Sequence, residues 1–157
     1  ILDRLEPKKI IIVSSAPQIR YPDCYGIDMA KLGDFIAFQA AIALIQENGK
    51  QSLLDEVYSL CKDADKNGNL KSENFVKKIY EPFTYQQVSD KVSELLTHKD
   101  INAGVQIIFQ KVEDLHEACP GNTGDWYFTG NYPTPGGNKV VNKSFINYME
   151  GVNERAY

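Results

Sequence analysis

Two runs of aliphatic residues stand out in the pattern of apolar and polar positions along the chain. The first, residues 8–15, contains four consecutive aliphatic side chains and ends in small polar residues. A continuous run of this length is typical of a strand buried on both faces, as in a parallel sheet covered by helices. Residues 104–110 form the second run. The two runs and the helical patterns between them predict an α/β fold.

Apolar residues recur at helical spacing over much of the chain outside these runs. Thr84 is a side chain that can cap a helix, and Asn48-Gly49 is a typical helix end. Residues 18–29 are rich in proline and other turn formers, so we expect no regular element there. We predict helices over residues 31–48, 53–61, 72–82, 85–96, 112–118 and 143–152.

Two strands alone do not form a sheet that is stable by itself. The chain also begins at Ile1 rather than at a methionine. We therefore expect either a fragment of a longer protein or a domain that borrows strands from sequence outside these residues. An open sheet edge can pair with another copy of the chain, so we also expect a homo-oligomer.

Composition and charge narrow the class of protein. Of the 157 residues, 43% are hydrophobic and 24% are charged, which is close to the average of globular proteins. The net charge of -4 argues against nucleic acid as a partner, because phosphate binding needs a basic face. No apolar run approaches the ~20 residues of a membrane span. The three cysteines form no disulfide framework, so we expect a reducing compartment and a cytoplasmic location.

Residues 63–74 resemble the twelve-residue calcium loop that joins two helices. Oxygen-bearing side chains fall at the ligand positions, and Gly68 stands where such loops turn sharply. Position twelve holds Asn74 instead of the usual bidentate glutamate. The alternative is an Asx-rich turn between two helices. The segment is therefore a weak calcium candidate, with Asp63, Asp65, Asn67 and Asn69 as its ligands.

No other motif predicts catalysis or a metal site. His98 and His116 lie far apart and lack the spacing of zinc ligands, so we interpret them as solvent-facing residues at helix ends. The cysteines contain no CxxC pair, and Cys61 falls on an apolar helix face, where it belongs to the core. The sequence has no GxSxG, Walker or GxGxxG motif. We therefore assign no catalytic residue to the chain.

Residues 13–29, VSSAPQIRYPDCYGIDM, closely resemble one region of the amidophosphoribosyltransferases. Residues 104–118 resemble the last strand and helix of that family, and residues 128–134, FTGNYPT, resemble a further element. The resemblance implies the C-terminal part of a type I phosphoribosyltransferase-like parallel sheet, made by residues 1–38 and 84–157. Residues 39–83 have no counterpart in the family, and we interpret them as a helical insertion.

The resemblance implies an enzyme of purine synthesis. The full-length protein would hydrolyse glutamine at an N-terminal cysteine and pass the ammonia to phosphoribosylpyrophosphate, with Mg²⁺ on the pyrophosphate. The product would be 5-phosphoribosylamine, in the first step of de novo purine synthesis. The nucleophile and the acidic substrate loop of the family are not among these residues. We therefore expect the chain to be inactive alone and to need the N-terminal part of the same protein as its partner.

The resemblance and the general rule for α/β sheets together place a ligand loop after the first strand. Loops at the carboxyl ends of parallel strands carry ligand sites in such sheets. The hydroxyls of Ser14 and Ser15 are candidates to line the substrate pocket, and Arg20 is a candidate to bind an anion there. The alternative is that this loop only shapes a turn.

Some members of the family bind a [4Fe-4S] cluster through cysteines near the YGID motif and in a CxxC before the FTGxYPT element. Here Asp23 stands at the first ligand position, with Cys24 one residue later, and no cysteine directly precedes Phe128. A cluster needs four thiolates, so we expect no iron–sulfur cluster. The competing hypothesis for the whole chain is a non-catalytic calcium-responsive or protein-interaction module.

Overall fold

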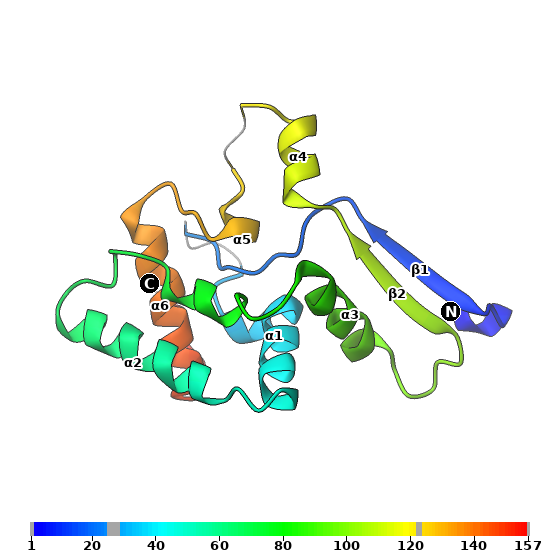
Figure 1. Cartoon of the computed structure of the whole chain (residues 1–157), viewed down its shortest axis with the longest axis horizontal. Helices are drawn as coiled ribbons and strands as arrows, with labels where there is room; N and C mark the ends of the chain where they lie inside the picture. The colour runs from blue at the N-terminus through cyan, green and yellow to red at the C-terminus, as the bar shows by residue number, and fades with distance from the viewer. Residues whose placement is uncertain (1, 25–28, 122–123, 157) are drawn as a thin grey trace.

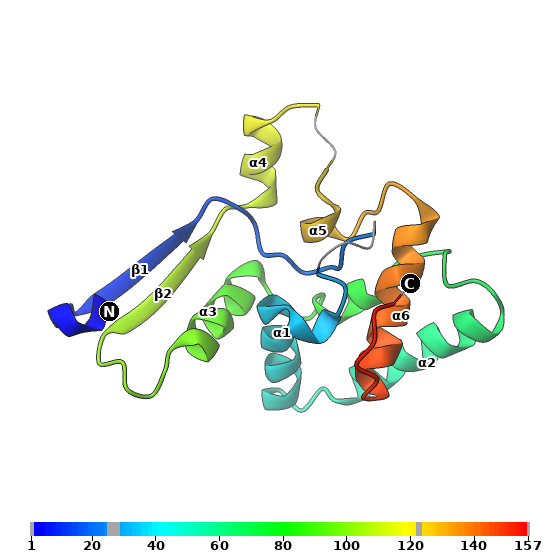
Figure 2. The ribbon, with the colours of Figure 1, turned by 180° about the vertical axis from the view of Figure 1, so that it is seen from behind.

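The two aliphatic runs form the two strands of a parallel sheet in the computed structural model, which describes residues 2–24, 29–121 and 124–156. Strand β1 (Lys9–Ser14) pairs with β2 (Gly104–Phe109), and the register sets Lys9 opposite Gly104. The fold is thus mixed α/β, mostly helical, as the strand and helix patterns predicted. Figures 1 and 2 show the sheet as an arm that extends from a helical body.

The prediction that β1 is buried on both faces is wrong for this chain. Ile11 is 53% exposed, Ile12 48% and Val13 73%. Side chains of successive strand residues point to opposite faces, so both faces of β1 are open. The reason is that α3 (Tyr85–Leu96), which also packs on α1, makes its main strand contacts with β2, while β1 is paired with β2.

Helix α3 begins where the sequence predicted, because Thr84 and Gln87 form a reciprocal capping box. Helix α3 also holds the edge of β2 that faces away from β1, through one hydroxyl group. The Gly104 amide donates to the carbonyl of Lys8, just before β1, and the Gln110 amide donates to the carbonyl of Ser14 in β1. Because amides alternate between the two edges of a strand, the Ile107 amide points away from β1. Ser93 Oγ of α3 accepts that hydrogen bond at 2.9 Å. The edge strand is therefore tied to the helix by a polar contact inside the core.

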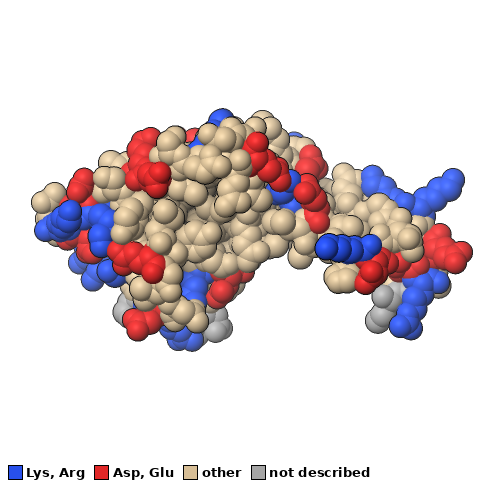
Figure 3. Space-filling view, turned by 90° about the horizontal axis from the view of Figure 1, so that it is seen from below, with Lys and Arg blue, Asp and Glu red and all other residues tan. Residues whose placement is uncertain are grey.

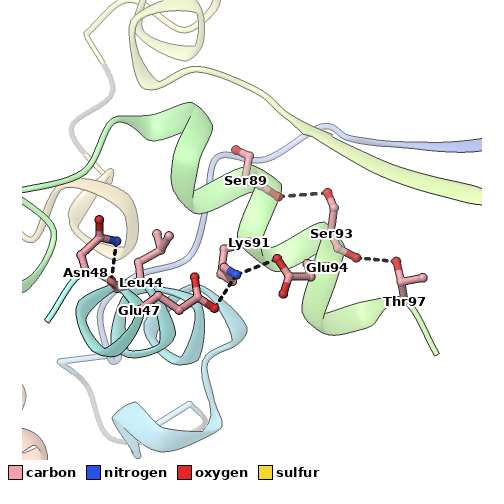
Figure 4. A network of polar contacts seen from close by, with 8 residues as sticks. All are labelled: Leu44, Glu47, Asn48, Ser89, Lys91, Ser93, Glu94 and Thr97. Atoms are coloured by element: carbon pink, nitrogen blue, oxygen red, sulfur yellow. Dashed lines mark hydrogen bonds and ion pairs between the residues drawn. The ribbon is translucent and has the colours of Figure 1, made fainter. Parts of the chain in front are cut away.

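A buried cation links α3 to the helical body (Figure 4). The Lys91 ammonium lies 2.7 Å from a Glu47 carboxylate oxygen of helix α1 (Ile36–Glu47) and 2.6 Å from one of Glu94. These two hydrogen bonds raise the pKa of Lys91. The side chain of Lys91 is 8% exposed, and a buried charge is tolerated when it is paired in this way.

The rest of the body packs around α1 and the last helix. Their shared core includes the fully buried side chains of Phe38, Ile45 and Phe145. The remaining elements are η1 (Leu2–Leu5), η2 (Leu32–Asp34), α2 (Ser52–Lys66), η3 (Phe75–Ile79), α4 (Val112–Ala118), α5 (Trp126–Thr129) and α6 (Pro135–Met149). The expected boundary between residues 38 and 39 falls inside α1, and side chains on both sides of it enter this core.

Four helices depart from their predicted bounds. The helix predicted over 31–48 is divided into η2 and α1, and α1 begins only at Ile36. Helix α2 continues past residue 61, because Ala64 extends the buried stripe of Val57 and Cys61. The predicted helix over 72–82 is a short 3-10 helix, η3. Helix α6 starts eight residues before the predicted Lys143, with Pro135 in its first turn. Proline is favoured there because the amides of the first turn have no partner within the helix. No helix within the described ranges is long and apolar enough to cross a membrane.

The buried side-chain amide of Asn142 in α6 holds the segment that joins α2 to η3 against α6. Asn142 is 0% exposed, and its Nδ2 donates to the carbonyls of Leu70 and Glu73 at 3.0 and 2.8 Å. Its Oδ1 accepts from the amide of Phe75 at 3.1 Å. Residues 70–75 form no regular ladder, so this side chain supplies partners that secondary structure would otherwise give.

Replacing Asn142 with Leu should lower the free energy of unfolding by about 2–4 kcal/mol, because it leaves buried backbone groups without partners. The matched control is Asn138→Ala, which removes one hydrogen bond to Lys71 from a less buried position on α6. Urea unfolding followed by far-UV circular dichroism measures both. Equal losses in the two variants would contradict the role assigned to Asn142.

Candidate functional site

The loops that follow β1 and β2 meet at one tyrosine hydroxyl. Tyr85, the first residue of α3, accepts a hydrogen bond from the Gln18 amide at 2.9 Å. It donates to the carbonyl of Gln110 at 2.8 Å. Carboxyl ends of parallel strands lie at one edge of a sheet, where α/β proteins place ligands. The loop after β1 therefore lies at this edge, beside the loop that follows β2.

Gln18 is the buried centre of this junction, at 1% exposure. Its Nε2 donates to the carbonyl of Tyr85 at 2.9 Å and to Ser89 Oγ at 2.7 Å. Its Oε1 accepts from Arg20 Nε at 3.0 Å and from Nη2 at 2.7 Å. The amide therefore joins the loop to α3 and holds one edge of the guanidinium.

The Arg20 guanidinium is held by neutral groups on several sides. Its central carbon lies 4.8 Å from the ring centroid of Tyr80 and 5.1 Å from that of Tyr85. Aromatic rings at such distances attract a cation through the ring quadrupole. Among the described residues, no carboxylate oxygen of Asp or Glu lies within 4.0 Å of a guanidinium nitrogen of Arg20. The charge of Arg20 is thus oriented without being neutralised there.

A surface pocket of about 310 Å³ opens beside this cation. Lys111 adds a second positive charge to its wall, and Glu113 of α4 adds one carboxylate. Two cations against one carboxylate favour an anionic ligand. The lining residues are Arg20, Tyr21, Tyr85, Lys111, Val112, Glu113, Phe128 and Thr129.

Burial keeps the tyrosines around the pocket protonated. It raises the pKa of Tyr80 well above its ordinary value and also raises those of Tyr21 and Tyr85. A tyrosine with a raised pKa stays neutral to higher pH than a free one, so its hydroxyl remains a donor. Tyr80 uses this hydroxyl to donate to the carbonyl of Arg20 at 3.1 Å.

The three sequence-predicted pocket residues have different positions. Arg20 lines the pocket. The Ser14 hydroxyl donates to the carbonyl of Ala16 at 2.9 Å and accepts from its amide, so it shapes the turn after β1. Ser15 is exposed and is not among the lining residues. Of the three candidates, Arg20 is therefore the one that lines the pocket.

Four residues of the site escape prediction from the sequence. Gln18 and Tyr80 are buried polar residues, and each has a hydrogen-bond partner more than fifty positions away in the chain. The local pattern marks Tyr85 only as a helix start, and Lys111 only as a residue between a strand and a helix. A weak signal exists, since both Gln18 and Arg20 belong to the segment of family resemblance.

The calcium-loop candidates lie on and after the end of α2. Asp63 and Asp65 are helical residues, and they lie 3.8 Å from the ammonium of Lys66 and 3.5 Å from that of Lys143, respectively. Asn67 is the C-cap residue, and Gly68 has a positive φ of 72°. The structure therefore arranges these oxygens along a helix end and beside cations, as in the alternative of an Asx-rich turn.

Titration calorimetry with millimolar calcium should show no saturable binding to the chain, because the carboxylates face lysines and a bidentate glutamate is absent. The Asp63→Ala variant is the matched control and should give the same trace. Binding at micromolar calcium that disappears in this variant would contradict the prediction and favour the calcium-responsive module.

The cysteines and histidines are dispersed over the described chain. Cys61 is buried, Cys24 is half-buried and Cys119 is exposed. Burial raises the pKa of Cys61 to about 12, so its thiol stays protonated at neutral pH. His116 is a half-exposed residue that contacts Asp125 at 2.9 Å. No group of three or more His, Cys, Asp or Glu that could hold a metal ion exists among the described residues.

The described residues offer no complete donor set for magnesium or for the iron–sulfur cluster that some members of the resembled family bind. A magnesium ion prefers oxygen ligands, whereas the pocket offers one carboxylate beside two cations. An iron–sulfur cluster needs four thiolates, and the chain has three cysteines. In the resembled family, magnesium binds the pyrophosphate group of the substrate. The acidic substrate loop of that family is not among these residues.

The wall of the pocket depends on one glycine next to Thr129. Gly130 has a φ of 71°, and a Cβ there would lie 2.5 Å from Asn74 Nδ2 and 3.0 Å from the ring of Tyr21. Asn74 donates to the Gly130 carbonyl at 3.2 Å. Both the backbone conformation and the space therefore require glycine.

Replacing Gly130 with Ala should lower the free energy of unfolding by about 2–4 kcal/mol, through left-handed backbone strain and overpacking together. Gly49→Ala is the matched control, because Gly49 has a φ of 65° and a Cβ added there would meet nothing within 4 Å. That variant should lose only about 1 kcal/mol. Thermal unfolding measures both, and equal losses would show that the contact with Asn74 is unimportant.

Comparison with known proteins adds no assignment. No family description, curated protein or solved structure matches the chain.

Proposed function

We propose that this chain is the C-terminal part of an amidophosphoribosyltransferase and that Arg20 contributes to its anion site. The full enzyme makes 5-phosphoribosylamine from phosphoribosylpyrophosphate and glutamine. The observation that carries the proposal is the Arg20 guanidinium, which lies in a pocket at the carboxyl ends of two parallel strands without a carboxylate partner among the described residues. A phosphate or pyrophosphate group has the charge and geometry that a guanidinium recognises.

Two further features support this proposal. Residues 13–29 have the sequence pattern of the family, and Arg20 belongs to it. The open faces of β1, with Val13 at 73% exposure, are those of a strand that normally lies within a larger sheet. A phosphoribosyltransferase sheet would cover β1 with further strands and helices from the preceding part of the protein.

This chain's own contribution to the reaction is binding. Arg20 and Lys111 provide positive charge for a phosphate group, and the aromatic wall of Tyr21, Tyr85 and Phe128 keeps one side of the pocket apolar. Glutamine cleavage needs an activated nucleophile with a base and an oxyanion site. None of the described groups forms such a constellation, so these steps belong to the remainder of the enzyme.

The test is pyrophosphate release from phosphoribosylpyrophosphate with magnesium and either glutamine or ammonia. The intact protein that carries this chain should turn over, and the isolated 157 residues should not. Arg20→Gln in the intact protein should raise KM for phosphoribosylpyrophosphate by about tenfold or more, which corresponds to the loss of a charge-assisted contact.

Ser15→Ala is the matched control on the same loop, because Ser15 is exposed outside the pocket. Its KM should stay within about twofold of wild type. Turnover by the isolated chain would contradict the fragment assignment, and an unchanged KM in Arg20→Gln would contradict the anion role.

A further inference from the structure

The segment 39–83, which has no counterpart in the resembled family, contributes a residue to the anion site. Tyr80 directly follows η3 and is 4% exposed. Its ring lies under the Arg20 guanidinium at 4.8 Å, and its hydroxyl donates to the Arg20 carbonyl at 3.1 Å. One buried side chain therefore contacts both the backbone and the charged end of the same arginine.

Tyr80 is itself held by contacts at both ends of its short segment. Asn74 caps η3 by accepting from the Val76 amide at 3.1 Å, and it donates to the carbonyl of Gly130 in the pocket wall. The ring of Tyr21 meets that of Tyr80 edge-on at 5.5 Å between centroids. These contacts leave the Tyr80 ring little freedom to move away from Arg20.

The chemistry of this support matters for an anion site. A carboxylate would orient a guanidinium but would also compete with an anionic ligand for its charge. The faces of Tyr80 and Tyr85 and the Gln18 amide oxygen restrain Arg20 while they carry no net charge. An arginine restrained in this way loses less side-chain entropy when it binds a ligand.

We infer that Tyr80 is a positioning residue that holds Arg20 in its anion-binding orientation, so that segment 39–83 forms one support of the site. The inference rests on the proposed anion role of Arg20. It assigns segment 39–83 a role in supporting Arg20, and this role does not depend on calcium binding by residues 63–74.

Titration calorimetry of the full chain with inorganic pyrophosphate tests the inference. Tyr80→Leu should weaken pyrophosphate binding by about three- to tenfold, as expected when one long side chain must be ordered on binding. Tyr80→Phe keeps the ring and should stay within about twofold of wild type. Tyr58→Leu is the matched control, because Tyr58 also contacts a cation, Lys62, but on α2 outside the pocket.

A nuclear magnetic resonance signal reports the position of Arg20 directly. The chain contains three arginines, so the Arg20 Nε–H resonance is assigned by its disappearance in Arg20→Gln. In the wild-type chain it should be shifted upfield by the two rings and should move when pyrophosphate is added. In Tyr80→Leu it should return toward the position of an unrestrained arginine.

The outcomes separate this inference from the proposed function. If Arg20→Gln abolishes pyrophosphate binding while a folded Tyr80→Leu binds like wild type, the positioning role is wrong and the anion role stands. If Arg20→Gln binds like wild type, or the wild-type chain does not bind, the anion role is wrong and the positioning role with it. If Tyr80→Leu does not fold, an unshifted Arg20 resonance in the wild-type chain overturns the inference by itself.

Discussion

The buried amide of Gln18 is the contact on which the site depends. It ties the loop after β1 to the first turn of α3 and orients Arg20 at the same time. A buried amide that lost these partners would cost more free energy than each hydrogen bond contributes when made. The polar junction therefore fixes one arrangement of the two strand ends, and the pocket beside them inherits that geometry.

The helical body supports this junction from the other side. Asn142 of α6 anchors the irregular residues before η3, and η3 then presents Tyr80 to Arg20. The ion pair of Lys91 with Glu47 connects α3 to α1 (Figure 4). Because these contacts join segments far apart in the chain, the site is rigid only when the whole body is folded.

The sheet differs from the helical body because aliphatic side chains of β1 are exposed. β1 exposes Ile11, Ile12 and Val13 on an arm that extends beyond the body, and aliphatic surface of this kind is usually covered in a working protein. On the face seen in Figure 3, positive and negative side chains are interspersed without a large area of one sign.

The sequence by itself determined the elements whose signal is local. The run at 8–15 predicted β1, the cap at Thr84 predicted the start of α3, and residues 104–110 predicted β2, because period and capping depend on near neighbours. Only the tertiary structure decided that α2 continues through Asp63 and Asp65, that β1 lies open, and that Tyr80 supports Arg20. These outcomes depend on contacts such as Tyr80 with Arg20, sixty positions apart, and no local pattern records which distant partner a buried polar group will find.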